Sequence, residues 1–429
     1  MNGFKNEKLL IISNNVLSLT RNNGKTIFSY IDCLPRENVA QLYFNAEMPS
    51  IEGYSYFQIT DKDVIRGILS PKKRGRAVTA RPINGEKRGA GAGVRRGNLE
   101  RLARDVLWHR KWNSKKLREW LDAFRPTTVF FVGGDSGFAY DIYHYVVKRY
   151  QAKSALYITD DYVMPRKNDN PVGRIRRNQI RGAVRRALKH TDTFFTVSSV
   201  MQKEYRSVFG RDSETIVNLA ESHRLDLPEE PSAEITLLYA GSLYYGRDEV
   251  LGKIAAALET YNQQGSGRRA RLNVYTNTEP AEDSKKRFEI EGSSRYCGSL
   301  GKEELKLALN RADILVFAES FDEMQIEKTQ YSLSTKVPEY LSVGKPILAV
   351  GPRQIGSMEH LAGVACCVHN GDELEERLLS LLSDSEWQGK LAEDALKKYR
   401  DDHDREKLQS HFIRSLFLQS TDQGQALTD

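Results

Sequence analysis

Residues Ser334–Pro352 read STKVPEYLSVGKPILAVGP, and this order decides how the second half of the chain folds. The apolar run ILAV predicts a buried strand, and another apolar run, DILVFAE, ends shortly before the stretch. The residues between these two strands must therefore form a short crossover helix. Ser334 or Thr335 can cap its N-terminus, and Gly344 can end it. Pro338 is tolerated because it falls in the first turn.

The first turn of this helix brings together groups that suit a nucleotide. Free backbone N–H groups, the hydroxyls of Ser334 and Thr335 and the amine of Lys336 favour a diphosphate. Glu339 follows one turn later on about the same face. Its carboxylate can accept two hydrogen bonds from the vicinal hydroxyls of a ribose. The pattern predicts a nucleotide-sugar site, and the alternative is a capped structural helix with an exposed Lys–Glu pair.

Apolar strands alternate with amphipathic helices along the whole chain, which is typical of α/β proteins with parallel sheets. The pattern stops at residues 224–234, RLDLPEEPSAE, and then restarts, so this segment is interpreted as a linker. A chain of 429 residues also favours two domains. We expect two Rossmann-like domains that face each other across a cleft, at residues 1–225 and 233–395. Residues 396–429 are expected to form a helix that returns to the first domain, and a tail.

The composition fits a soluble globular protein, with 40 % hydrophobic and 28 % charged residues. No apolar run approaches the roughly 18 residues that a membrane span needs. The first residues, MNGFKNEKLLIIS, do not resemble a signal peptide. The four cysteines show neither C-x-x-C spacing nor a disulfide framework. These features predict a reduced, cytoplasmic protein.

Positive charge is concentrated in the first half of the chain. Sixteen Lys and Arg stand against three acids at residues 72–118, and nine against one at residues 166–189. Residues 70–100 are rich in Gly and Arg without an apolar period, which predicts a mobile insertion. Such an asymmetry indicates a polyanionic partner, although a solvated charged face would look the same.

Three tryptophans lie among these basic residues and narrow the choice of partner: Trp108, Trp112 and Trp120. Aromatic and cationic side chains together are typical of membrane interfaces. We therefore expect a peripheral protein at the inner face of the cell membrane, bound to the anionic surface through its basic N-terminal segments. Nucleic acid is not an expected partner, because the chain contains no recognisable nucleic-acid module.

A second candidate phosphate site follows the first strand of the second domain, in the segment YAGSLYYGRDE. Open α/β sheets bind ligands at the carboxyl ends of their strands. Gly241 and Ser242 end the strand, and Arg247 lies where the next helix begins. Their backbone N–H groups and the guanidinium can hold a phosphate, and the alternative is an ordinary strand-to-helix turn.

The segments STKVPEYLSVGKPILAV, YAGSL and YCGSLGKEELKLALNRADILVF, with the late helices, resemble the C-terminal domain of GT-B fold glycosyltransferases. The resemblance is to the retaining family-four enzymes of bacterial polysaccharide assembly (capsule, O-antigen and exopolysaccharide). It covers about residues 235–400, and the first half agrees by topology only. It implies that Glu339 binds the donor ribose, and that Lys336, Arg247 and the turn at Ser334 and Thr335 hold the diphosphate. No metal and no cofactor are implied.

The reaction implied by this resemblance moves a sugar from a nucleotide-diphosphate donor, with a UDP-sugar favoured, to a lipid-linked or saccharide acceptor with retention. One position departs from the family pattern. Many of these enzymes have a Glu-x7-Glu pair, and Tyr331 stands where the first glutamate would be. The chain resembles a smaller branch with a Pro/Ser-x-Lys-x-x-Glu form. A nucleotide-sugar 2-epimerase, a non-catalytic binding subunit and a nucleic-acid-binding protein remain as alternatives.

In the first domain, residues of three segments are expected at the cleft. Gly24 in SLTRNNGKTI is expected between the first strand and the first helix. In GT-B enzymes the backbone of this loop comes close to the donor phosphate and the acceptor, and glycine allows such an approach. Asp135 in VGGDSGF, and Asp160 and Asp161 in YITDDYVMP, each follow a buried strand. These carboxylates are candidate catalytic bases for an acceptor hydroxyl. The alternatives are a flexible loop at Gly24 and structural capping at the Asp–Asp pair.

Overall fold

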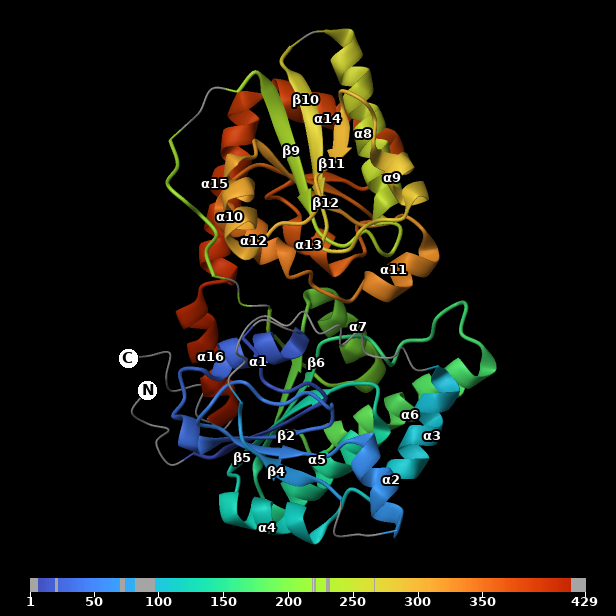
Figure 1. Ribbon diagram of the computed structural model, residues 1–429, viewed down its shortest axis with the longest axis vertical. Helices are drawn as coiled ribbons and strands as arrows, with labels where there is room; N and C mark the ends of the chain where they lie inside the picture. The colour runs from blue at the N-terminus through green and yellow to red at the C-terminus, as the bar shows by residue number, and fades with distance from the viewer. Residues whose placement is uncertain are drawn as a thin grey trace. The chain divides into compact units, whose positions relative to one another are not determined.

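The computed structural model shows a chain that divides into two compact units (Figure 1). The first consists of Met1–Ile216 and Glu406–Asp429, and the second of Val217–Arg405. The structure describes residues 7–19, 22–69, 74–81, 97–217, 219, 221–228, 232–265 and 267–417. No helix within these ranges is long and apolar enough to cross a membrane. Most of the basic insertion predicted near residues 70–100 lies outside the described residues.

The first unit is built on an eight-stranded sheet with the order β4-β3-β2-β1-β5-β6-β7-β8. Neighbouring strands are parallel, except that β4 runs antiparallel to β3. The central strands are buried along their whole length, as expected for a sheet covered on both faces. The strands are β1 Leu9–Ser13, β2 Val39–Tyr43, β3 Ser55–Gln58, β4 Arg76–Val78, β5 Thr128–Gly133, β6 Lys153–Ile158, β7 Thr193–Thr196 and β8 Glu214–Thr215.

Helices from both ends of the chain cover this sheet. They are α1 Asn22–Ile31, α2 Asp61–Leu69, α3 Asn98–Trp108, α4 Lys115–Phe124, α5 Gly137–Tyr150, α6 Pro171–Leu188, α7 Ser199–Phe209 and α16 Arg405–Phe417. The ring of Phe412 in α16 packs against Tyr30, Phe130 and Phe195 of the first unit. In Figure 1, α16 (red) accordingly lies beside α1 (blue). A C-terminal helix returns to the first domain as predicted, but it begins at Arg405, and residues 396–402 belong to α15 of the second unit.

Two predictions in the basic region were wrong. Residues 99–124, LERLARDVLWHRKWNSKKLREWLDAF, read in the sequence as one basic helix, but they are broken into α3 and α4, because Arg110 adopts a left-handed backbone with φ of 54°. Ser114 then starts α4 by accepting a hydrogen bond from the Leu117 amide at 3.2 Å. Residues 76–78, expected to lack regular structure, form the edge strand β4.

Two of the three tryptophans of this region are core residues. Trp108 is fully buried, and its ring stacks on Phe138 with 3.9 Å between centroids. Trp112 is buried as well, and the half-buried Trp120 donates its indole N–H to the Ser55 hydroxyl at 2.9 Å. The sequence interpretation of Trp108 and Trp112 as interfacial rings was therefore wrong.

The second unit is a six-stranded parallel sheet with the order β11-β10-β9-β12-β13-β14. This order is that of the Rossmann fold, with the reversal between β9 and β12. Its strands are β9 Glu234–Ala240, β10 Arg269–Tyr275, β11 Ser294–Tyr296, β12 Ile314–Ala318, β13 Ile347–Val350 and β14 Cys366–Val368. Its helices are α8 Arg247–Gln264, α9 Glu282–Phe288, α10 Lys302–Arg311, α11 Glu323–Thr329, α12 Lys336–Val343, α13 Gly356–Leu361, α14 Leu374–Ser383 and α15 Ser385–Asp402.

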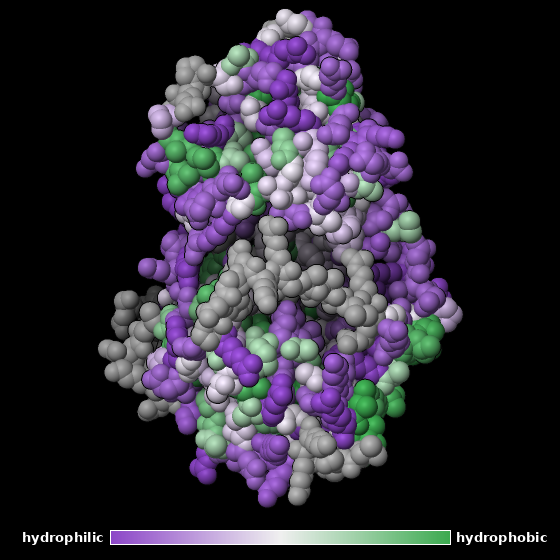
Figure 2. Space-filling view, in the orientation of Figure 1, coloured by the Kyte–Doolittle hydropathy of each residue, from purple (hydrophilic) through white to green (hydrophobic). Residues whose placement is uncertain are grey.

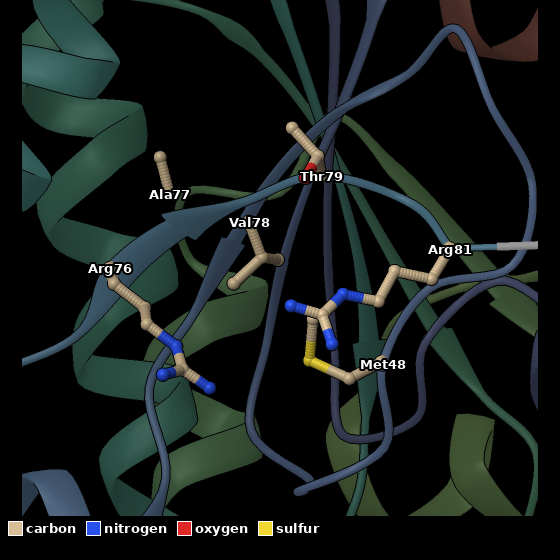
Figure 3. A pocket seen from close by; sticks show the side chains of 6 residues that line it. All are labelled: Met48, Arg76, Ala77, Val78, Thr79 and Arg81. Carbon is tan, nitrogen blue, oxygen red and sulfur yellow. The ribbon is translucent and has the colours of Figure 1, made fainter.

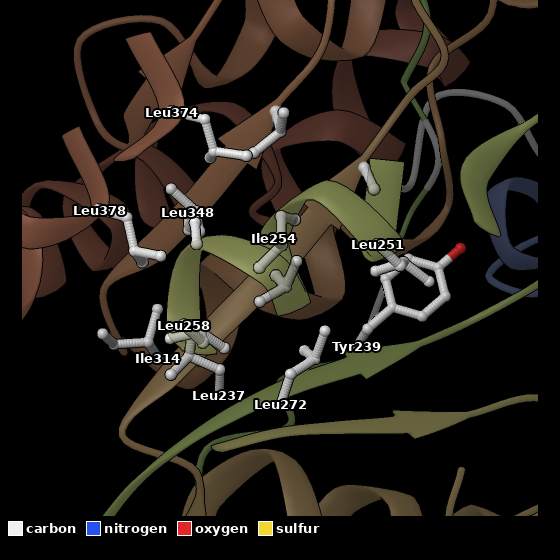
Figure 4. Packing of buried hydrophobic residues seen from close by; sticks show 14 of the residues in the cluster. Leu237, Tyr239, Leu251, Ile254, Leu258, Leu272, Ile314, Leu348, Leu374 and Leu378 are labelled. Carbon is white, nitrogen blue, oxygen red and sulfur yellow. The ribbon is translucent and has the colours of Figure 1, made fainter. Parts of the chain in front are cut away.

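Aliphatic side chains of α8 and α14 fill the space over this sheet (Figure 4). Leu251, Ile254 and Leu258 recur at helical spacing along α8 and are fully buried against the strands. This apolar layer fixes the height of α8 over the sheet. It thereby determines the position of Arg247, the first residue of α8, at the carboxyl ends of the strands.

The stretch Ser334–Pro352 folds as its sequence predicts. The crossover helix is α12, with Pro338 in its first turn, and it leads into β13. Gly344 ends α12 in a left-handed conformation with φ of 72°. A Cβ atom there would also come within 2.5 Å of the Leu396 side chain on α15. Glycine is thus needed both to end the helix and to let α15 pack against it.

A buried histidine pair in the second unit predicts acid sensitivity. The Nε2 atoms of His360 and His403 lie 2.9 Å apart, and burial followed by the neighbouring histidine lowers the pKa of His360 to about 3. Below pH ~6.5 the unfolded chain takes up a proton that the folded unit does not, so stability falls as the pH decreases, by up to about 1.4 kcal/mol per pH unit. The measurement is the unfolding midpoint at several pH values, for the wild type and His360→Asn. A variant with the same acid slope as the wild type would contradict this.

Candidate functional site

The candidate donor site lies where the strand order of the second sheet reverses. Gly241 and Ser242 follow β9, and Glu319 follows β12, so their loops meet at the carboxyl ends of the two central strands. The Tyr340 hydroxyl of α12 lies 3.2 Å from the amide nitrogen of Ala240 and 3.4 Å from its carbonyl oxygen. These contacts hold the start of α12 against the end of β9.

Lys336, the first residue of α12, occupies a position that only glycine at residue 241 leaves open. Its Nζ atom lies 4.9 Å from the centroid of the Tyr239 ring, at cation–π distance. A Cβ atom on Gly241 would lie 1.6 Å from this Nζ atom. Burial, together with the charge of Arg247, lowers the pKa of the Lys336 amine to about 8. The amine is therefore a partly desolvated cation at the end of β9.

Arg247 is the second cation of the site, and it is held by a residue that the sequence interpretation did not select. Its Nη2 atom lies 2.8 Å from Glu319 Oε1, with the side chains 13 % and 3 % exposed. The other oxygen, Glu319 Oε2, is buried and has no hydrogen-bond partner among the described residues. Glu319 thus positions the guanidinium from inside the unit. Its place directly after a buried strand was the only signal in the sequence.

The loop between β9 and α8 carries backbone strain next to these cations. Tyr245 has φ of 66°, a left-handed conformation that bulky residues rarely adopt. The Arg247 guanidinium lies 5.6 Å from the centroid of the Tyr245 ring. Gly246 follows with φ of 72°, and a Cβ atom there would come within 2.8 Å of the Ser320 hydroxyl. Strained backbone of this kind is concentrated at ligand sites.

The remaining predicted donor residues surround the start of α12. Glu339 is half-buried, and within the described chain no hydrogen bond reaches its carboxylate. Thr335 is exposed and caps α12 by backbone position only, while the Ser334 hydroxyl accepts from the Lys336 amide at 3.4 Å. The Ser334 amide in turn donates to the Ser357 hydroxyl at 2.9 Å. The structure thus brings Lys336, Arg247 and Gly241 together, with Glu339 one turn along α12.

The first unit has its own cavity at the carboxyl ends of β1, β5 and β6, with a volume of about 360 Å³. Amides, hydroxyls and two carboxylates line it beside aromatic rings, and none of its lining residues is Lys or Arg. The lining residues are Ser13, Asn14, Asn15, Asn23, Phe44, Phe131, Val132, Gly133, Gly134, Asp135, Ser136, Ala139, Thr159, Asp160 and Tyr162. This lining suits a neutral, hydroxyl-rich ligand.

Two of the predicted carboxylates line this cavity. The Asp160 carboxylate accepts from the Thr159 hydroxyl at 3.3 Å, and that hydroxyl accepts from the Asn23 amide group at 3.0 Å. Burial raises the pKa of Asp160 above its usual value, and the carboxylates of Asp161 and Asp135 add to the rise. Asp135 forms an ion pair with Arg101 at 2.8 Å.

The third predicted carboxylate has a structural role. One oxygen of Asp161 accepts three hydrogen bonds of 3.0 Å each, from the amides of Val163 and Met164 and from the Tyr205 hydroxyl. Asp161 does not line the cavity. The alternative of structural capping therefore describes this residue, because its carboxylate holds the loop that follows β6.

Gly24 also differs from its expected setting. It lies inside α1 rather than in the loop before the helix, and it is buried. A Cβ atom there would come within 2.1 Å of the Val16 carbonyl oxygen. Glycine is thus required by close packing of α1 against the segment after β1.

A further cavity of about 620 Å³ lies at the edge strand β4 (Figure 3). The side chains of Arg76, Arg81 and Met48 converge on it in this view. It is formed at the edge of the sheet and not at the reversal of strand order, so it is separate from the cavity that Asp160 lines. Among the described residues, no three His, Cys, Asp or Glu side chains gather as metal ligands.

The two Rossmann-like units, each with a central parallel sheet, define the GT-B fold. No protein-family model matches the sequence, and no curated protein matches it. Solved structures do match, and these neighbours are GT-B glycosyltransferases.

Three examples that cover nearly the whole chain show the extent of the likeness. The E. coli trehalose-6-phosphate protein bound with UDP-2-fluoro glucose is 13 % identical, with a TM-score of 0.59, over 96 % of this chain and 99 % of that one. HepE of Anabaena in complex with UDP-glucose is 10 % identical, with a TM-score of 0.55, over 95 % of this chain and 99 % of that one. The α,α-trehalose-phosphate synthase (UDP-forming) of Burkholderia xenovorans, in complex with glucose-6-phosphate, is 10 % identical, with a TM-score of 0.58. The match covers 95 % of this chain and 100 % of that one. At these identities the likeness establishes the fold.

Proposed function

We propose that the protein is a glycosyltransferase that uses a nucleoside diphosphate sugar, with UDP-sugar as the favoured donor. The observation that carries the proposal is the pair of cations, Lys336 and Arg247, at the reversal of strand order in the second sheet. This is where open α/β sheets bind nucleotides, and a partly desolvated cation interacts strongly with phosphate. Fold neighbours bound with UDP-2-fluoro glucose and UDP-glucose support the choice of donor.

In the proposed reaction, the bond between the anomeric carbon and the diphosphate breaks, and a bond to an acceptor oxygen forms. Lys336, Arg247 and the first turn of α12 stabilise the charge that develops on the departing diphosphate. Glu339 binds the ribose hydroxyls. These roles need no metal ion, because fixed cations and helix N–H groups supply the positive charge.

The acceptor is proposed to bind in the cavity of the first unit. The cavity lining of amides, hydroxyls and carboxylates fits the hydroxyls of a neutral sugar residue, either free or in a lipid-linked saccharide. Asp160 accepts the proton of the attacking hydroxyl, and Asp135 orients the acceptor. In this one-step displacement, retention requires the acceptor oxygen to approach from the face of the sugar ring that the diphosphate leaves. Retention, and a role in cell-surface polysaccharide assembly, rest on the resemblance of the second domain to retaining family-four enzymes.

The test is a turnover assay with a panel of UDP-sugars and GDP-sugars, with and without neutral saccharide acceptors. Release of the nucleoside diphosphate and formation of a glycoside are followed together. One donor with acceptor-stimulated release supports the proposal. Conversion of a donor into its epimer without an acceptor would identify an epimerase instead.

One observation favours a second candidate, a non-catalytic subunit that binds the nucleotide. Tyr331, in the turn between α11 and α12, stands where many related enzymes have the first glutamate of a Glu-x7-Glu pair. A neutral side chain there can leave the donor bound but unreactive. Binding of UDP without turnover of any donor in the panel would favour this candidate.

The depressed pKa of Lys336 predicts that donor binding takes up a proton. Near pH 8 part of the Lys336 amine is neutral in the free protein, and an anionic diphosphate stabilises its charged form. The diphosphate of a UDP-sugar, unlike the terminal phosphate of UDP, does not titrate between about pH 6.5 and 8. The calorimetric enthalpy of UDP-sugar binding should therefore depend on the ionisation enthalpy of the buffer at pH 8, and affinity should fall as the pH rises above 8. At pH 6.5 the buffer dependence should vanish. Equal buffer dependence at both pH values would contradict the role of Lys336.

A further inference from the structure

Three neighbouring helices of the first unit expose large apolar side chains. The side chains are Ile65 and Ile68 on α2, Leu99 and Val106 on α3, and Ile175 on α6, and each is between 51 % and 75 % exposed. On α3 the two apolar residues are seven positions apart and share one face, with the exposed Ala103 between them. Figure 2 shows apolar side chains gathered over this part of the molecule, at the lower right.

Ion pairs hold the three helices together as one surface. Helix α3 packs against both α2 and α6. Arg104 of α3 binds Asp61 of α2 at 2.7 Å, and a buried ion pair joins Asp105 of α3 to Arg176 of α6. Arg104 and Asp105 of α3 thus make their ion pairs toward the neighbouring helices, while Leu99 and Val106 are exposed on the outside of the helix.

Exposed basic side chains outnumber exposed acids on these helices. Within the described residues, six cations on α2, α6 and the turn after α3 are exposed, against one exposed acid, Glu100. The cations are Lys62, Arg66, Arg110, Arg174, Arg185 and Arg186. Exposed apolar residues in a cationic frame are typical of surfaces that insert into the headgroup region of an anionic bilayer. A second copy of this chain would bring the same cationic face against itself, and like charges oppose that contact.

We propose that α2, α3 and α6 form a docking surface for an anionic lipid bilayer. Leu99, Val106 and Ile175 enter the interface, and the surrounding Lys and Arg side chains bind lipid phosphates and carboxylates. The helices α3 and α6 lie in the basic segments that the sequence predicted to bind the membrane, but exposed aliphatic side chains take the place of the tryptophans. It is also independent of the proposed transferase activity, since none of its residues belongs to the donor site or lines the cavity near Asp160.

The test is co-sedimentation of the full chain with vesicles of phosphatidylcholine alone and of phosphatidylcholine with phosphatidylserine. We expect binding to the anionic vesicles only, weakened by salt, and at least about tenfold weaker in the triple variant Leu99→Ser/Val106→Ser/Ile175→Ser. The matched control is Met324→Ser/Leu379→Ser, which removes exposed apolar residues of the second unit. These surface changes should leave the thermal midpoint and UDP binding unchanged.

Three results would overturn the proposal. The first is a wild-type chain that does not bind anionic vesicles, and the second is a triple variant that binds as well as the control. The third is a wild-type dimer in sedimentation equilibrium that the triple variant abolishes. That result would show that the surface is the contact between two copies of the chain. Because UDP binding is measured on the same variants, a failure of the docking proposal is distinguishable from a failure of the transferase proposal.

Discussion

Replacing Lys336 with methionine should lower kcat/KM for the nucleotide-sugar donor by about 10²–10³-fold, as is common when one preorganised group that stabilises transition-state charge is removed. Methionine keeps much of the volume of the side chain beside Tyr239 but removes the cation. The loss should fall mainly on kcat, because charge on the diphosphate grows as the glycosidic bond breaks. Steady-state kinetics of donor turnover, with thermal unfolding as the control for folding, measure it.

The Gly241→Ala variant should reproduce this loss while leaving the lysine in the chain. The new methyl group would take the place of the Lys336 amine, whose Nζ atom lies 1.6 Å from the ideal Cβ position. The amine ends a flexible side chain, so we expect it to move away and the fold to persist. Gly389→Ala on α15 is the matched control, because nothing lies within 4 Å of its Cβ position. A Gly241→Ala variant with wild-type donor kinetics would show that the observed position of Lys336 is not the functional one.

The second large effect is expected at Asp160. Asp160→Asn should lower transfer to the acceptor by about 10²–10⁴-fold, the usual contribution of a general base, while UDP binding stays unchanged. Because burial raises the pKa of Asp160, the acidic limb of the wild-type kcat/KM profile should lie above the usual range of aspartate. That limb reports ionisation of the base, so it should be missing from the residual activity of the variant.

The neighbouring aspartate provides the control for this experiment. The Asp161 carboxylate accepts three hydrogen bonds, and Asp161→Asn removes its negative charge. The hydrogen bonds should weaken, so the variant should have a lower thermal midpoint. The folded fraction should keep its transfer rate at neutral pH, and its acidic limb should move to lower pH because the Asp161 charge contributes to the raised pKa of Asp160. If Asp161→Asn instead abolished transfer without loss of stability, the roles of the two residues would be reversed.

Local patterns in the sequence were sufficient for much of the fold. The helix stop at Gly344 and the apolar run of β13 predicted the α12 crossover, and with it the neighbourhood of Lys336 and Glu339. The break after α3 was missed because it depends on the left-handed backbone of Arg110, a residue type with no strong preference for that conformation.

Contacts between distant residues were beyond the sequence. The Arg247–Glu319 ion pair joins residues 72 positions apart, so its existence depends on strand order. Asp160 and Asp161 are adjacent residues of the same type, so the sequence does not distinguish them. Only the side-chain directions in the structure show that Asp160 lines the cavity and that Asp161 holds the loop. Trp108 and Trp112 were misplaced for the same reason, since their burial depends on contacts with Phe138 and Tyr145, which lie elsewhere in the chain.

A crystal structure of the protein with UDP tests the donor site most directly. We predict the diphosphate within hydrogen-bond distance of Lys336 Nζ and the Arg247 guanidinium, and the ribose hydroxyls on the Glu339 carboxylate. UDP bound at another place in the chain, with these three side chains unchanged, would contradict the assignment of the site at the ends of β9 and β12.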